Sequence, residues 1–147
     1  MAELPGLAGT RLGTSALHAI DQPRIELFAE ATEDHQWLHT DPERAAAGPF
    51  GGTIAHGYLT LSLGSALLWE VLEVTDADQV INYGLGKVRF PSPVPAGARI
   101  EMSVDLVSVV EVTGGYALEM IWTFRVPGTD KPACVAEAIF RYLRVPT

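Results

Sequence analysis

Asp34 and His39, five residues apart, are the residues of this sequence best suited to proton transfer. A carboxyl group and an imidazole have ordinary pKa values of about 3.9 and 6.5, and a partly buried site can tune both. A structural use of the pair is also open and is commoner: Asp34 ends a turn, and His39 hydrogen-bonds to nearby backbone. Spacing alone leaves both interpretations standing.

The tripeptide Ala55-His56-Gly57 opens the longest apolar helical pattern of the chain. Free backbone amides at a helix N-terminus, aided by the helix dipole, can hold an anion or a developing oxyanion. Gly57 lets a ligand approach the backbone closely, or it only lets the helix pack against other structure. Ser65, two turns further on, can hydrogen-bond to a polar group beside the helix start, although such a serine more often permits close packing.

Asp34, His35, His39, Asp41 and His56 supply the residue types of a metal site. The sequence has no HExxH motif, no CxxC motif and no repeated histidine spacing, so we expect no metal.

Other catalytic motifs are also missing. The sequence has no G-x-S-x-G elbow of a serine hydrolase, and Gly84-Leu85-Gly86 is neither a phosphate-binding loop nor a dinucleotide fingerprint. Lys87 and Arg89 point the same way on an expected strand and can meet phosphates. A solvated strand edge is the commoner reason for such a pair.

The composition is that of one ordinary globular domain. The chain has 147 residues, of which 48% are hydrophobic and 19% charged. A net charge of −8 argues against a nucleic-acid surface, which needs a basic face. The N-terminus lacks the pattern of a signal peptide, and Cys134 is the single cysteine, so we expect a cytoplasmic protein.

The first half of the chain reads as helices and a loop. Residues 1–12 are expected to be a poorly ordered lead-in, and 14–20 a short strand. A helix capped by Asp21 should run to about residue 32, followed by an irregular loop over 33–55. Thr53 is a candidate cap for the next helix, over about 56–72. That helix is apolar on nearly every side and, at 17 residues, short for a membrane span, so we expect it in the core.

The second half alternates in hydrophobicity with a period of two. It predicts strands over 80–90, 99–112, 116–126 and 133–145, with an irregularity in the first of them at Gly84 and Gly86. Tight turns join the last three strands into an antiparallel meander whose apolar face needs a cover. Only the 56–72 helix is apolar enough. The sequence therefore predicts a single α+β domain, an antiparallel sheet curled around one long helix.

The segment 28–45, together with Phe50 and Ala55-His56-Gly57, resembles the MaoC-like (R)-specific enoyl-CoA hydratases, and most closely their NodN-like single-domain branch. The signature of that family runs Asp-x-Asn-Pro-Leu-His and, after five further residues, a small residue. Four positions match it: Asp34, Leu38, His39 and Ala45. The resemblance continues through the expected core helix to residues 83–91, covers most of the chain, and favours proton transfer over the structural interpretation.

The resemblance implies a hot-dog fold and a lyase reaction. Asp34 and His39 would hold and activate a water molecule, which adds to a trans-2-enoyl thioester to give the (3R)-hydroxyacyl thioester, or leaves in the reverse dehydration. The Gly57 amide would stabilise the enolate oxygen of the thioester. Ser65 would orient the aspartate, and His56 belongs to the same substrate-binding group.

The resemblance also implies partners. The substrate is a thioester of coenzyme A or of an acyl-carrier protein, and no metal or redox cofactor is expected. Because CoA is anionic and the chain acidic, local basic residues should meet its phosphates, and Arg44, Lys87 and Arg89 are the candidates. The loop over 40–55 should roof the acyl site. Two copies are expected to pair through an exposed sheet edge as a homodimer.

Three positions depart from the family pattern. Gln36 and Trp37 stand in place of the Asn and Pro of the signature, which affects the expected shape of the acyl pocket. Gly86 stands where relatives have an asparagine that positions substrate. Two rival functions remain: a hot-dog acyl-CoA thioesterase, which activates water against the carbonyl, and a non-catalytic acyl-thioester-binding protein.

Overall fold

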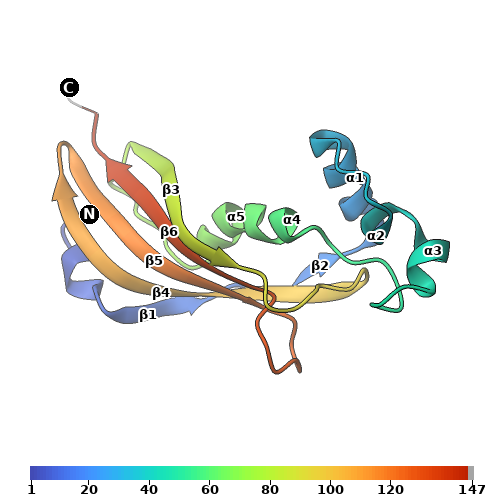
Figure 1. Ribbon diagram of the computed structural model, residues 1–147. Coiled ribbons are helices and arrows are strands. Elements are labelled where there is room, and N and C mark those ends of the chain that lie inside the picture. The colour runs from blue at the N-terminus through green and yellow to red at the C-terminus, as the bar shows by residue number, and fades with distance from the viewer. Residues whose placement is uncertain (146–147) are drawn as a thin grey trace.

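Three long strands, β4 (Ala98–Val112), β5 (Gly115–Arg125) and β6 (Cys134–Leu143), form the antiparallel meander that the alternation predicts. This computed structural model describes residues 1–145, and residues 146 and 147 lie outside the described residues (Figure 1). Alternate side chains of the meander are almost completely buried: Ile100, Met102, Val104, Leu106, Leu118, Met120, Trp122, Phe124, Cys134, Ala136, Ala138, Phe140 and Tyr142. Burying a large apolar side chain stabilises the fold by about 1.5–3 kcal/mol, so this face is the core.

The other strands extend the sheet on both sides of the meander. β3 (Gln79–Arg89) pairs with β6 and forms one edge, while β1 (Thr10–Thr14) and β2 (His18–Ile20) both pair with β4. The register of β3 shifts twice, at its two glycines, which confirms the predicted irregularity.

The N-terminal prediction is wrong. A 3-10 helix, η1 (Leu4–Leu7), and most of β1 occupy the stretch expected to be poorly ordered. The strand expected over 14–20 is divided between the end of β1 and β2. Backbone pairing with β4 orders this segment although its sequence does not alternate.

The core helix is two short helices in line, α4 (Gly57–Ser62) and α5 (Gly64–Leu68), and it ends four residues before the predicted end. Its C-terminal end tightens into i→i+3 bonds, from Glu70 N to Leu67 O and from Val71 N to Leu68 O. Gly64 lies against the sheet, because a Cβ there would stand 2.2 Å from the Trp122 ring. Only glycine permits this approach of helix to sheet.

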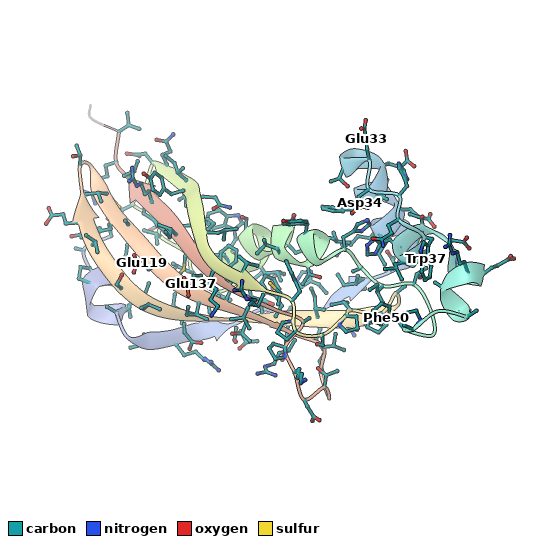
Figure 2. All side chains as sticks on the ribbon, viewed as in Figure 1. Glu33, Asp34, Trp37, Phe50, Glu119 and Glu137 are labelled. Atoms are coloured by element: carbon teal, nitrogen blue, oxygen red, sulfur yellow. The ribbon has the colours of Figure 1, made fainter. Side chains whose placement is uncertain are left out.

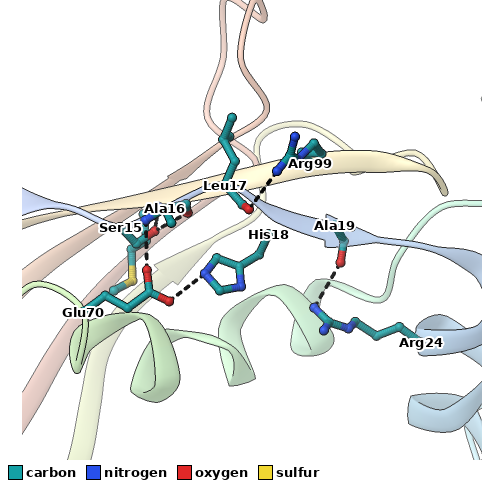
Figure 3. A network of polar contacts seen from close by, with 9 residues as sticks. Ser15, Ala16, Leu17, His18, Ala19, Arg24, Glu70 and Arg99 are labelled. Atoms are coloured by element: carbon teal, nitrogen blue, oxygen red, sulfur yellow. Dashed lines mark hydrogen bonds and ion pairs between the residues drawn. The ribbon is translucent and has the colours of Figure 1, made fainter.

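A polar network fixes the end of α5 to the N-terminal strands (Figure 3). The Glu70 carboxylate accepts from Ala16 N at 2.9 Å and contacts His18 Nε2 at 2.7 Å. Nearby, the buried Ser15 hydroxyl donates to Ala16 O and accepts from Met102 N. These contacts hold the helix over the concave side of the sheet.

Residues 21–56, here called the helical arm, leave the sheet at the end where α4 begins (Figure 1). They contain α1 (Gln22–Thr32), α2 (Trp37–Thr40) and α3 (Pro42–Ala46), and the last two lie in the segment expected to be irregular. The Asp21 carboxylate accepts from Arg24 N at 3.0 Å and caps α1, as predicted. Thr53 is not the cap of α4: that position is His56, which makes no side-chain cap bond.

The sheet covers one side of α4 and α5, and the opposite side is open. Leu59, Leu67 and Leu68 are buried, whereas Tyr58 is 70% exposed and Trp69 is 51% exposed. Within residues 1–145, every helix is too short or too polar to span a membrane.

Candidate active site

The helical arm brings Asp34 together with two histidines. One carboxylate oxygen of Asp34 and one ring nitrogen each of His39 and His56 all lie within 4.8 Å of one another. The chain reaches Asp34 through Glu33, which ends α1 in the left-handed region at φ 61°. This conformation turns the chain from α1 back toward α2, and the exposed Asp34 lies at the turn (Figure 2).

His39 is held with one nitrogen occupied and the other available. Its Nδ1 lies 2.7 Å from the Ile54 carbonyl oxygen, and its side chain is buried. A carbonyl oxygen only accepts, so Nδ1 carries a proton, and in the neutral ring Nε2 then keeps the lone pair. An imidazole fixed in this form is ready to accept a proton at Nε2.

His56 supports both members of the pair. Its Nε2 donates to the backbone carbonyl oxygen of Asp34 at 2.9 Å, and its ring stacks on that of His39 with centroids 3.7 Å apart. Burial lowers the pKa of His56, against the opposing effect of the bond to the Asp34 carbonyl. His56 is therefore a neutral ring, and its buried Nδ1 has no hydrogen-bond partner within residues 1–145.

The three residues have donor types that bind zinc, but their geometry does not favour it. An imidazole binds a metal in its own ring plane, and the planes of His39 and His56 are only 27° apart in a stack. Two stacked rings cannot both direct in-plane lone pairs at one ion. The absence of a metal stays a prediction.

A pocket of about 350 Å³ adjoins this group. His39 and Gly57 form part of its wall, together with Phe50, Thr60, Phe90 and the loop over 91–94. A Cβ on Gly57 would stand 3.0 Å from the Phe90 ring, so this glycine permits a close approach of helix and loop. Because α4 begins at Gly57, the amides of its first turn have no partner inside the helix.

Thr60 and Phe90 were not found from the sequence. Thr60 lies one turn after Gly57 on the same helix and is buried, a spacing that points toward the same face. Phe90 directly follows β3, and no sequence pattern joins it to Gly57.

Similarity to known proteins shows the family of the chain. The model of the MaoC-like domain matches residues 5–119. The chain belongs to the MaoC-like family. A 3-hydroxyacyl-thioester dehydratase Z of Mycobacterium tuberculosis is 49% identical over 144 residues, which are 97% of this chain and 95% of that protein. Nodulation protein N of Rhizobium leguminosarum bv. viciae is 42% identical over 143 residues, 95% of this chain and 88% of that protein.

Solved structures confirm the predicted α+β hot-dog fold. An (R)-hydratase from A. caviae superposes with a TM-score of 0.76 at 25% identity, over 92% of this chain and 96% of that chain.

The departures from the MaoC-like signature have local explanations. Trp37 packs away from the pocket wall: it lies under the Arg44 guanidinium at 4.5 Å, and a Cβ on Gly48 would stand 3.0 Å from its ring (Figure 2). A Cβ on Gly86 would stand 2.3 Å from Glu137 Oε2, the same oxygen that accepts from Lys87 N at 2.9 Å. An asparagine at position 86 would displace Glu137.

The remaining candidates lie farther from the pocket. Ser65 is on α5 and is not part of the pocket wall. Lys87 and Arg89 flank Val88, which packs against the core, so their side chains point to the outer face of the sheet. Contacts of these residues and of Arg44 with CoA phosphates, and the role of Ser65, stay predictions.

Proposed function

We propose that this protein is a hydratase/dehydratase that interconverts trans-2-enoyl thioesters and (3R)-hydroxyacyl thioesters. The carrying observation is that His39, with Nδ1 bound to the Ile54 carbonyl, lies in the wall of a pocket that also contains Gly57, and that a carboxylate oxygen of Asp34 lies within 4.8 Å of a His39 ring nitrogen. Membership of the MaoC-like family and 49% identity to a 3-hydroxyacyl-thioester dehydratase support the proposal.

In the hydration direction, Asp34 and His39 hold one water molecule between the carboxylate and Nε2. The water oxygen forms a bond to C3 of the enoyl group and gives a proton to the Asp34–His39 pair, and the pair delivers one proton to C2, so that it ends in the state in which it began. Dehydration runs the same steps backward. The bond from His39 Nδ1 to the Ile54 carbonyl keeps the lone pair of Nε2 directed at the reacting group.

Attack at C3 moves negative charge onto the thioester oxygen. The Gly57 amide, at the open first turn of α4, would donate a hydrogen bond to that enolate oxygen. The bond is worth most in the transition state, because the charge develops there. The chemistry uses groups of the chain, and we propose that it needs no metal or redox cofactor.

The substrate is an acyl thioester of coenzyme A or of an acyl-carrier protein. Phe50, Thr60 and Phe90 would contact its acyl or pantetheine part in the pocket. We assign Arg44, Lys87 and Arg89 to the phosphates of the carrier, although the last two would require the carrier to reach the outer face. We place the reaction in the cytoplasm.

We also propose a homodimer. Within residues 1–145, β3 pairs only with β6 and leaves one edge open, and large apolar side chains are exposed on or beside it and on or beside α4 and α5: Tyr58, Trp69, Tyr83, Leu85 and Phe90. An exposed edge beside an apolar patch is a surface for self-association. Sedimentation velocity at low micromolar concentration should give twice the 15.8 kDa of the chain, and a monomer there would contradict this part.

The test of the reaction is loss of the conjugated enoyl absorbance of crotonyl-CoA on adding the purified protein. Asp34→Asn and His39→Gln should each lower the rate about a hundredfold or more, because each removes a group that transfers a proton. The product should be consumed by an (R)-specific 3-hydroxyacyl-CoA dehydrogenase.

His35→Gln and Glu33→Gln are matched controls, since both side chains are exposed neighbours outside the pocket wall and should keep full activity. Release of free thiol without hydration would favour the thioesterase. Tight binding of the acyl thioester with no turnover, unchanged by Asp34→Asn, would favour the binding protein.

A further inference from the structure

The available nitrogen of His39 depends on where the Ile54 carbonyl lies. α2, which carries His39, has four residues, too few to be stable as an isolated helix. Its position must therefore come from contacts outside it. Ile54 N donates to Leu38 O at 3.0 Å, and Ala55 N donates to Val94 O at 2.8 Å. These bonds hold the 53–55 segment beside α2.

Two polar side chains close a ring of hydrogen bonds around this contact. Gln22, the first residue of α1, donates from Nε2 to the His39 carbonyl oxygen at 2.8 Å. Its Oε1 accepts from the Thr53 hydroxyl at 2.5 Å. Thr53 precedes Ile54, whose carbonyl accepts from His39 Nδ1, so the ring returns to His39.

We propose that Gln22 and Thr53 are positioning residues that hold the Ile54 carbonyl against His39 and thereby select the imidazole form with a free Nε2. The Gln22 amide acts as a spacer between the backbone of His39 and the residue before Ile54. Neither side chain is part of the pocket wall, so their effect passes through His39. The role in catalysis rests on the proposed function, but the effect on the imidazole does not.

Two members of this ring of hydrogen bonds, Thr53 and His39, are buried, whereas Gln22 is half-buried, and the burial makes the network sensitive to loss of a partner. Thr53 and His39 are 7% and 8% exposed, so water cannot readily replace the hydroxyl. Without the Thr53 hydroxyl, Gln22 Oε1 loses its partner, and the 53–55 segment loses the side-chain bond that ties it to α1, while its backbone bonds remain. A displaced Ile54 carbonyl no longer fixes the proton on Nδ1, and the two neutral tautomers then mix.

The experiment uses three variants. Thr53→Val keeps the shape of the side chain and removes the hydroxyl, whereas Thr53→Ser keeps a hydroxyl. Gln22→Met removes both hydrogen bonds of the Gln22 amide. Nitrogen-15 NMR of labelled histidine, assigned to His39 with His39→Gln, reports the tautomer. We expect one protonated Nδ1 in the wild type and in Thr53→Ser, and averaged nitrogen signals in the other two variants. Loss of such a supporting bond should lower kcat about tenfold to a hundredfold with KM within about twofold.

Ser15→Ala is the matched control. Ser15 is also 7% exposed and hydrogen-bonded, but it lies between β1 and β2, away from the pocket. It should lower stability comparably and leave the His39 signals and kcat unchanged. A wild-type His39 signal in both Thr53→Val and Gln22→Met would overturn the proposal, and if one variant fails to fold the other decides. If the wild type is inactive but Thr53→Val and Gln22→Met show the expected NMR changes, the proposed reaction is wrong and the positioning of His39 by Gln22 and Thr53 is still supported.

Discussion

The sheet and the helical arm are held together in different ways. The sheet has long ladders of backbone bonds, with one register shift between β4 and β5, and one apolar face of almost fully buried side chains. In the arm, single polar side chains that reach carbonyl oxygens position the groups around the site: Gln22 to His39, His39 to Ile54, and His56 to Asp34. Stability should therefore reside in the sheet, and the geometry of the reacting groups in the arm.

This difference teaches where a substitution acts. The sheet is stabilised by many similar contacts and unfolds as one unit, so a cavity or a clash there lowers the free energy of unfolding of the whole domain. In the arm, one lost bond moves one group, and the remainder of the fold stays intact. Three substitutions test this division, in order of decreasing effect.

Gly64→Ala should have the largest effect, on stability. The new methyl group would stand 2.2 Å from the Trp122 ring, which is itself packed against Phe124 and Phe140. Overpacking of this kind costs about 1–3 kcal/mol, measured as a lower midpoint of urea unfolding. Gly84→Ala is the control: among residues 1–145 nothing lies within 4 Å of a Cβ added there, and it should change stability by less than about 0.5 kcal/mol. Equal midpoints for the two variants would mean that the contact between Gly64 and the sheet does not limit the stability of the fold.

His56→Gln should change how stability depends on pH. Because burial lowers the pKa of His56, the unfolded chain binds a proton below pH ~6.5 that the folded chain does not. Stability is complete above that pH and is lost as the pH falls, by at most about 1.4 kcal/mol per pH unit for one proton. The variant lacks this loss, so its free energy of unfolding should fall less than that of the wild type between pH 7.5 and 5.5.

Asp105 in the sheet supplies the control for that measurement. The hydrogen bond from Arg11 lowers its pKa, so its contribution is present above pH ~3.9 and is lost only at lower pH. Asp105→Asn should keep the wild-type slope between pH 7.5 and 5.5. A wild-type slope in His56→Gln would show that this ring does not couple the arm to pH.

Glu33→Gly should have the smallest effect, and a favourable one. Glu33 has φ 61°, a conformation that costs a non-glycine residue about 1–2 kcal/mol. Glycine avoids this cost, but its greater freedom in the unfolded chain cancels part of the gain in stability. A net gain of about 0.5 kcal/mol should raise the Tm by about 1–2 °C with unchanged activity. Glu30→Gly, inside α1, should instead lower the Tm. A lower Tm in both variants would mean that the turn at Glu33 is not strained.

The sheet was predictable because its pattern repeats. Each of β4, β5 and β6 starts and ends within two residues of its prediction, since alternation over ten or more residues leaves one consistent register. β1 was missed because Thr10–Thr14 does not alternate, and pairing with β4 is not visible from its own sequence.

The arm was predictable only in its chemistry. Asp34, His39 and Gly57 were named from residue types and family resemblance; His39 and Gly57 line one pocket, and Asp34 lies beside His39, while their roles stay predictions. α2 and α3, with four and five residues, are too short to show a helical period. Thr53 was expected to cap a helix, but its hydroxyl binds Gln22, because the folding of α1 against the 53–55 segment brings a better partner. Single polar contacts between distant residues leave no periodic signal.

The burial of Cys134 gives the molecule its own reporter of unfolding. It is the single cysteine of the chain, lies fully inside the core at the start of β6, and burial raises its pKa to about 12. At neutral pH the folded thiol is therefore both shielded and protonated, whereas an unfolded chain would expose an ordinary, reactive one. The rate at which a thiol reagent labels Cys134 then reports how often the sheet opens, without an added probe. Openings that are confined to the arm do not change this rate.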